Sequence, residues 1–120
     1  MADYRKYTNL DVWKEARLLV TEIYAVSKNF PKDEQFGLIT QLRRCAISIP
    51  SNIAEGCGRK SNKEFYQYLN ISLGSSFELE TQLILAKEFG YISEMSFAPL
   101  QLQIIEVQRM LAGLQRSLNT

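Results

Sequence analysis

Apolar residues recur every three or four positions along most of this chain, which is the period of an amphipathic α-helix rather than of a β-strand. Short connections that contain proline, glycine or serine separate four such segments. We expect helices over about residues 10–29, 33–57, 62–89 and 94–118. Four long helices with short joints pack as an antiparallel bundle, since each must bury its apolar stripe against the others. The pattern therefore predicts an all-α, up-down four-helix bundle that forms one domain over residues 1–120.

Local signals refine where these helices begin and how straight they are. Thr8 or Asn9 is expected to cap the first helix, because their side-chain oxygens accept hydrogen bonds from free backbone amides. Ser61 and Glu64 have the spacing of a capping box at the start of the third helix. Pro50 lies inside the second helix, where it removes a backbone hydrogen bond and crowds the preceding turn. We therefore expect a kink in the second helix near residues 46–50.

The third helix differs from the others because it carries two apolar stripes, about 100° apart. The first stripe is Phe65, Leu69, Ser72, Ser76, Leu79, Leu83 and Ala86. The second stripe is Tyr66, Leu73, Phe77 and Ile84. A helix at the surface of a single subunit needs only one such stripe. The third helix is therefore expected either to be central in the bundle or to be shared with another copy of the chain.

Composition fits one globular domain in a reducing compartment. The chain has 120 residues, of which 46% are hydrophobic and 22% charged, enough for a core without disulfide or metal staples. No apolar signal region follows the first basic residues, so we expect a cytoplasmic protein. Cys45 and Cys57 are twelve residues apart on one predicted helix. That spacing puts them about 18 Å apart along its axis, too far for a disulfide.

The chain has no histidine, and so lacks the commonest general base and the commonest metal ligand. It also has no glycine-rich phosphate loop, no Cys-x-x-Cys pair and no nucleophile elbow. We therefore expect no enzyme activity, no metal, no cofactor and no small-molecule substrate.

The net charge of +1 is unevenly distributed along the chain. Residues 43–63 carry five basic side chains and one acidic one, whereas residues 64–120 carry three basic and six acidic ones. An anionic partner is therefore expected at the middle segment. Its candidate nucleic-acid-binding residues are Arg43, Arg59, Lys60 and Lys63. The alternative is that the last three only keep an ordinary loop solvated.

A polar stripe accompanies the apolar face of the second helix. It consists of Arg44, Ser48, Asn52 and Glu55, which fall within about 80° of one another on a helical wheel. Three interpretations are open: a solvated flank, a hydrogen-bond network between helices, or a site in which Glu55 is an acid or base and Arg44 stabilises an anion. We favour the structural network, because a single glutamate without a nucleophile, histidine or metal set is not a recognisable catalytic site.

Four segments of the sequence resemble a known bacterial family. The main one is LRRCAISIPSNIAEG over residues 42–56, and the others are VWKEA at 12–16, FPKDEQFGL at 30–38 and GSSFELETQL at 74–83. Together they resemble four-helix-bundle proteins encoded by intervening sequences in 23S ribosomal RNA genes, which are often described as ribosomal-protein-like. The resemblance extends from about residue 10 to residue 118.

This resemblance implies a ring-shaped homopentamer. It also implies a relation to the accessory proteins of diversity-generating retroelements, which share the fold and bind nucleic acid through basic surface without catalysis. Two functions follow as expectations. One is a non-catalytic oligomeric bundle that holds RNA or DNA, and the alternative is a protein-interaction scaffold that binds no nucleic acid.

Overall fold

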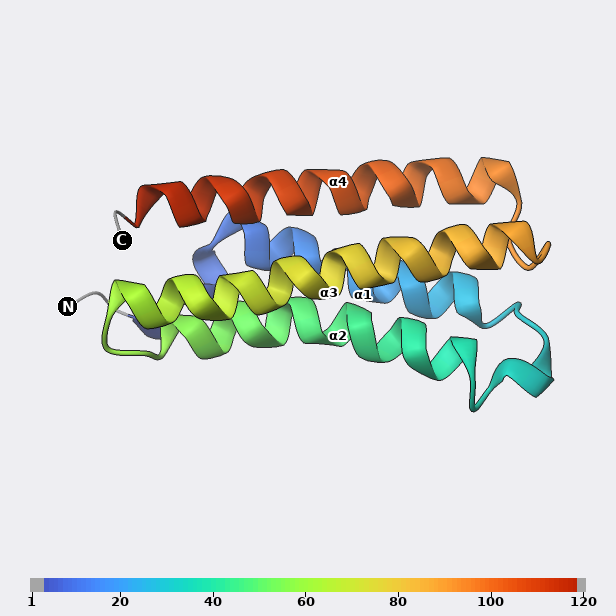
Figure 1. Cartoon of the computed structure of the whole chain (residues 1–120), viewed down its shortest axis with the longest axis horizontal. Helices are drawn as coiled ribbons and strands as arrows, with labels where there is room; N and C mark the ends of the chain where they lie inside the picture. The colour runs from blue at the N-terminus through green and yellow to red at the C-terminus, as the bar shows by residue number, and fades with distance from the viewer. Residues whose placement is uncertain (1–3, 119–120) are drawn as a thin grey trace.

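The computed structural model describes residues 4–118, and within that range it contains four α-helices and no strand (Figure 1). The all-α prediction is therefore confirmed. The elements in chain order are η1 (Tyr4–Asn9), α1 (Asp11–Ser27), η2 (Lys32–Glu34), α2 (Leu38–Cys57), α3 (Asn62–Glu88) and α4 (Glu94–Ser117), where η marks a 3₁₀ segment.

The four α-helices lie side by side, and successive helices run in opposite directions along one long axis (Figure 1). Each helix contacts two neighbours: α1 packs on α2 and α4, and α3 packs on the same two helices. No Cα atoms of the diagonal pairs come within 8 Å of each other, so the helices follow the order α1, α2, α3, α4 around the bundle. The described part measures 47 × 23 × 20 Å, the shape of a thin rod. The α1–α2 side and the α3–α4 side therefore lie on opposite faces of it.

One stripe from each helix builds the core. In α3 the buried residues are Leu69, Ser72, Ser76, Leu79, Leu83 and Ala86, all of them in the first predicted stripe. The two buried serines need hydrogen-bond partners, because a bare hydroxyl in a core is costly. Ser72 Oγ donates to the carbonyl of Ile49 on α2 at 2.8 Å, and Ser76 Oγ donates to the carbonyl of Leu73 at 2.6 Å. The first contact also ties α3 to α2.

The starts of α1 and α2 differ from the predictions. Leu10 precedes α1 and no side chain caps it, so the expected cap at Thr8 or Asn9 is wrong. Both residues instead belong to η1, which ends with the Leu10 amide donating to the Tyr7 carbonyl at 3.0 Å. The second helix begins at residue 38 rather than 33, because Gly37 leaves helical geometry with φ −117° and ψ −109°.

The starts of α3 and α4 match their local signals. Ser61 Oγ accepts a hydrogen bond from the Glu64 amide at 3.1 Å, and Ser93 Oγ accepts one from the Ser96 amide at 3.2 Å. Between these helices Gly90 has φ +81°, which reverses the chain sharply after α3. Helix α2 continues across Pro50, and the kink expected there stays a prediction. Over residues 4–118, none of the helices combines the length and apolar character that crossing a bilayer requires.

Candidate functional site

The middle of the polar stripe on α2 forms a hydrogen-bonded bridge to α3. Ser48 Oγ lies 2.8 Å from Ser75 Oγ on α3. Asn52 Nδ2 donates to the Ser48 carbonyl at 2.8 Å and to Ser48 Oγ at 3.0 Å. The structure therefore brings Ser48 and Asn52 together, and their contacts join two helices rather than face an open pocket.

The two charged ends of that stripe do not join this bridge. Glu55 accepts a hydrogen bond from Arg59 Nη2 at 2.8 Å, one turn further along. The Arg59 guanidinium also donates to the hydroxyl of Tyr68 and lies 4.7 Å from the centre of its ring. Arg44 is exposed and makes no hydrogen bond or ion pair with any residue between 4 and 118. It lies eleven residues before Glu55, about 16 Å along the helix, so these two charges cannot act on one group.

Arg43 links α1 to α2. Its Nε donates to Ser27 Oγ at 2.9 Å, its Nη2 donates to the Tyr24 carbonyl at 3.3 Å, and its guanidinium lies 4.4 Å from the centre of the Tyr24 ring. It lies fourteen residues before Cys57, the last residue of α2, which is about 21 Å along the helix, and Arg59 lies beyond that end. The four predicted nucleic-acid-binding residues therefore do not form one cluster.

The other three predicted basic residues lie at the turn between α2 and α3. Arg59 is engaged by Glu55 and Tyr68, whereas Lys60 and Lys63 are exposed and have no charged partner in the described part of the chain. With each helix divided at its midpoint, the half of the bundle that contains this turn carries eight basic and five acidic described side chains. The opposite half carries five basic and seven acidic ones. Positive charge is therefore concentrated at one end of the rod.

Large apolar side chains remain uncovered along α3 and α4. In the second predicted stripe of α3, Phe77 is 53% exposed and Ile84 is 38% exposed. Leu102 of α4 is 69% exposed. Along the bundle axis it lies between Phe77 and Ile84, because the neighbouring Gln101 donates a hydrogen bond to Glu80 of α3. We call this surface the α3–α4 outer face, and it consists of Phe77, Ile84, Leu85 and Leu102.

A polar seam lies between α3 and α4. Gln101 and Gln108 each donate to the Glu80 carboxylate at 3.2 Å, and Gln115 donates to Asn70 Oδ1 at 2.7 Å. One heptad before Gln101, Glu94 pairs with a lysine of α3. These α4 residues recur every seven positions. The spacing can be seen in the sequence, but a search for apolar periodicity misses it because the residues are polar. Because polar contacts join the two helices here, the α3–α4 outer face is left free for another surface.

The comparisons with known proteins identify the family. The family model described as 23S rRNA-intervening sequence protein matches residues 8–113. The chain belongs to this family. The resemblance seen in residues 42–56 and the other three segments is therefore confirmed.

No curated protein matches this family member. Among solved structures it is similar to a protein of unknown function from the S23 ribosomal protein family of Bacteroides thetaiotaomicron VPI-5482. The two are 24% identical, with a TM-score of 0.81 over 88% of this chain and 95% of the other. At this identity the likeness shows a shared fold.

The thiols of this 23S rRNA-intervening sequence protein are poor nucleophiles. Burial, followed by the nearby charge of Glu78, raises the pKa of Cys45 to about 11, and burial also raises the pKa of Cys57. Both are free and stay protonated at neutral pH. Within residues 4–118, no three histidine, cysteine or acidic side chains group together in a way that would hold a metal ion.

Proposed function

We propose that this family member is a non-catalytic building block that assembles with copies of itself through the α3–α4 outer face. The observation that carries the proposal is the exposure of Phe77 and Leu102, at 53% and 69%, beside Ile84 on the same surface. Contiguous exposed apolar side chains favour association, because covering them removes apolar surface from water.

A second copy is the occupant that best fits this face. In a closed ring this face of each copy packs against a different surface of the next copy. The outer positions of α3 between Gln67 and Leu85 suit such a contact, because they carry Glu78 as their only charge. The polar seam holds α4 in register on α3, so the face is a rigid surface that need not reorganise. The family resemblance implies five copies in a closed ring, and we propose that number for a cytoplasmic assembly.

Binding of RNA or DNA is the second candidate function, and the excess of basic side chains at one end of the rod favours it. In a ring of parallel subunits, Lys60 and Lys63 of every copy would gather at one rim, which adds many weak phosphate contacts together. Replacing both lysines with glutamine should weaken binding and flatten its salt dependence. The alternative, a protein-interaction scaffold, predicts a stable oligomer that shifts no labelled nucleic acid at moderate salt.

Sedimentation velocity of two matched double variants tests the assembly. Phe77→Gln with Leu102→Gln should convert the protein to a 13.8 kDa monomer whose circular dichroism is unchanged. Leu18→Gln with Phe36→Gln changes two exposed apolar residues away from the face and should leave the oligomer intact. Retained assembly in the first variant, or loss of assembly in the second, would contradict the proposal.

A further inference from the structure

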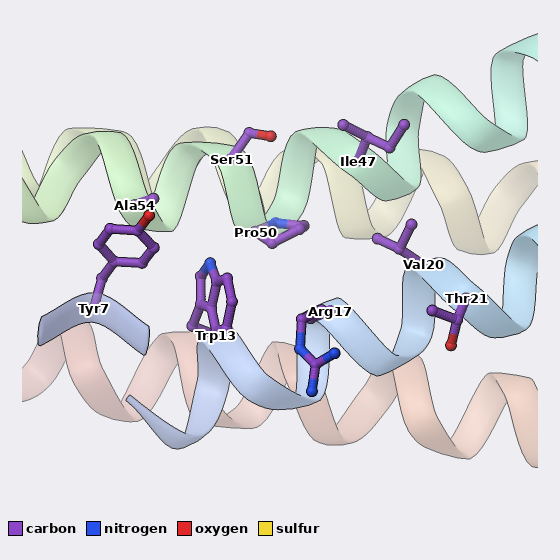
Figure 2. Close-up of a pocket in the computed structure, with 9 residues that line it drawn as sticks. All are labelled: Tyr7, Trp13, Arg17, Val20, Thr21, Ile47, Pro50, Ser51 and Ala54. Carbon is purple, nitrogen blue, oxygen red and sulfur yellow. The ribbon is translucent and has the colours of Figure 1, made fainter. Parts of the chain in front are cut away.

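The seam between α1 and α2, on the side of the bundle opposite the α3–α4 outer face, contains two adjoining hollows. The first has a volume of about 390 Å³ and is lined by Tyr7, Trp13 and Arg17 from one side and by Pro50 from the other (Figure 2). The second has a volume of about 370 Å³ and is lined by Tyr24, Arg43 and Arg44. Ile47 lines both hollows, so they adjoin, and we call the two together the α1–α2 groove.

Aromatic rings and guanidinium groups alternate along this groove. The rings of Tyr7 and Trp13 meet edge to face at 5.5 Å, and the Arg17 guanidinium lies 5.8 Å from the Trp13 ring. In Figure 2 the Trp13 indole stands in the gap with its ring nitrogen toward α2, and the Pro50 ring points into the same gap from above. Further along, the Arg43 guanidinium stacks on Tyr24 at 4.4 Å. Trp13 and Tyr24 are only half-buried, so their rings remain accessible.

The groove is also positive, because no acidic residue lines either hollow. The acidic side chains of α1, which are Asp11, Glu15 and Glu22, lie about half a turn around the helix from Trp13 and Arg17. Glu22 accordingly lines a different hollow, between α1 and α4. Glu55 of α2 is engaged by Arg59 on the flank that faces α3. Three arginines therefore line the groove, and no carboxylate lines it beside them.

We propose that the α1–α2 groove binds single-stranded nucleic acid, with unpaired bases stacked on Trp13 and Tyr7 and phosphates held by Arg17 and Arg44. Aromatic platforms bordered by basic residues bind unpaired strands with little sequence preference, because every base has a face that stacks. Arginine suits both contacts, since its planar group pairs with phosphate and stacks on rings. Arg43 is already bonded to α1 and would position the Tyr24 ring.

Two other anionic partners fit the groove less well. A duplex keeps its bases stacked inside and offers none to Trp13. An acidic peptide would pair with the arginines, but its carboxylate side chains would not stack on the aromatic rings. The site shares its class of ligand with the second candidate function above, but it lies on a different surface from Lys60 and Lys63 and does not depend on self-association.

Trp13 is the chain's single tryptophan and therefore reports directly on its own site. The full chain would be titrated with a short oligouridylate, an oligothymidylate of equal length, a duplex of that length and an oligoglutamate peptide. We expect the two single strands to quench Trp13 fluorescence saturably and the duplex and peptide to leave it unchanged. Quenching by only one of the strands would also support the groove and would identify the ligand as RNA or DNA.

Two double variants locate the contact. Arg17→Gln with Arg44→Gln changes exposed side chains and should raise the Kd for the quenching strand by about tenfold or more, since two phosphate contacts are lost. The matched control, Arg109→Gln with Arg116→Gln, changes two exposed arginines of α4 away from the groove and should leave this Kd unchanged.

Several outcomes would overturn the proposal that the α1–α2 groove binds single-stranded nucleic acid. They are binding without Trp13 quenching, equal quenching by duplex or peptide, and a Kd that ignores the two arginine substitutions. Binding that leaves Trp13 fluorescence unchanged, and that Lys60→Gln with Lys63→Gln abolishes, would remove the groove and keep the basic end as the nucleic-acid surface. No binding of any nucleic acid would remove both.

Discussion

Gly56 marks the closest approach between α2 and α3. It is buried near the end of α2, and a Cβ atom there would lie 2.7 Å from Phe65 Cδ1 and 2.8 Å from Tyr68 Cβ. The second of these atoms is fixed to the α3 backbone, so it cannot move aside. This approach also lets Tyr68 reach the guanidinium of Arg59. Only glycine fits the position, although its φ is ordinary.

Replacing Gly56 by alanine should therefore lower the free energy of unfolding by about 1–3 kcal/mol, the cost of overpacking a close contact. Gly113 of α4 is the matched control, because a Cβ there meets only Arg116 Nη2 at 3.7 Å. Alanine at that position should raise the free energy of unfolding by about 0.5–1 kcal/mol through helix propensity. Urea unfolding measures both changes, and equal effects at the two glycines would refute the close approach.

Cys45 gives a prediction about pH. Its pKa in the folded chain is raised from 9.0 to about 11, chiefly by burial. Above pH 9 the unfolded thiol ionises while the folded one still holds its proton, so this contribution to stability is complete below pH 9 and is lost as pH rises towards 11. In a Cys57→Ser background, native Cys45 should react with iodoacetamide at pH 8 far more slowly than the urea-unfolded thiol. Equal rates would show that the thiol is not shielded.

At the scale of the helices, the apolar period predicted which segments form helices and which of their faces are buried, but it did not predict every helix boundary. The starts of α3 and α4 follow local serine caps, so the sequence alone was sufficient there. The start of α1 is set by packing, because the ring of Tyr7 contacts the ring of Trp13 and the residues before Leu10 form the 3₁₀ segment η1. The polar seam escaped prediction because glutamines on a helix look like solvent-exposed residues until their α3 partners are known.

The Ser61 cap is the element-scale interaction that is easiest to test. Ser61→Ala removes the acceptor of the Glu64 amide and should lower the free energy of unfolding by about 1 kcal/mol. Ser61→Asp should restore the stability, because a carboxylate caps the same amide. Ser117→Ala is the control, since that exposed hydroxyl only donates to the Leu114 carbonyl of its own helix. Thermal unfolding that ranks the alanine variants in the opposite order would contradict this role of Ser61.

At the scale of the whole molecule, the sequence indicated the bundle but not how its charged residues are distributed over it. Arg43 and Arg59 look like neighbours in a basic segment, yet Arg43 lies about 21 Å before the end of α2 and Arg59 lies beyond that end. The α1–α2 groove was not predicted either, because Trp13 lies beside Pro50 and Tyr24 lies beside Arg43 only when α1 is antiparallel to α2. The second stripe of α3 was visible in the periodicity, and its Phe77 and Ile84 are left uncovered in a single subunit.

The molar mass of the purified wild-type chain, measured by multi-angle light scattering over a wide range of concentrations, tests self-association most directly. We predict a discrete assembly, because the α3–α4 outer face needs a partner surface. From the family resemblance we expect its mass to be five times the 13.8 kDa of one chain. A particle of 13.8 kDa that persists at the highest concentration would contradict the account, since Phe77 and Leu102 would then remain in water in the functional protein.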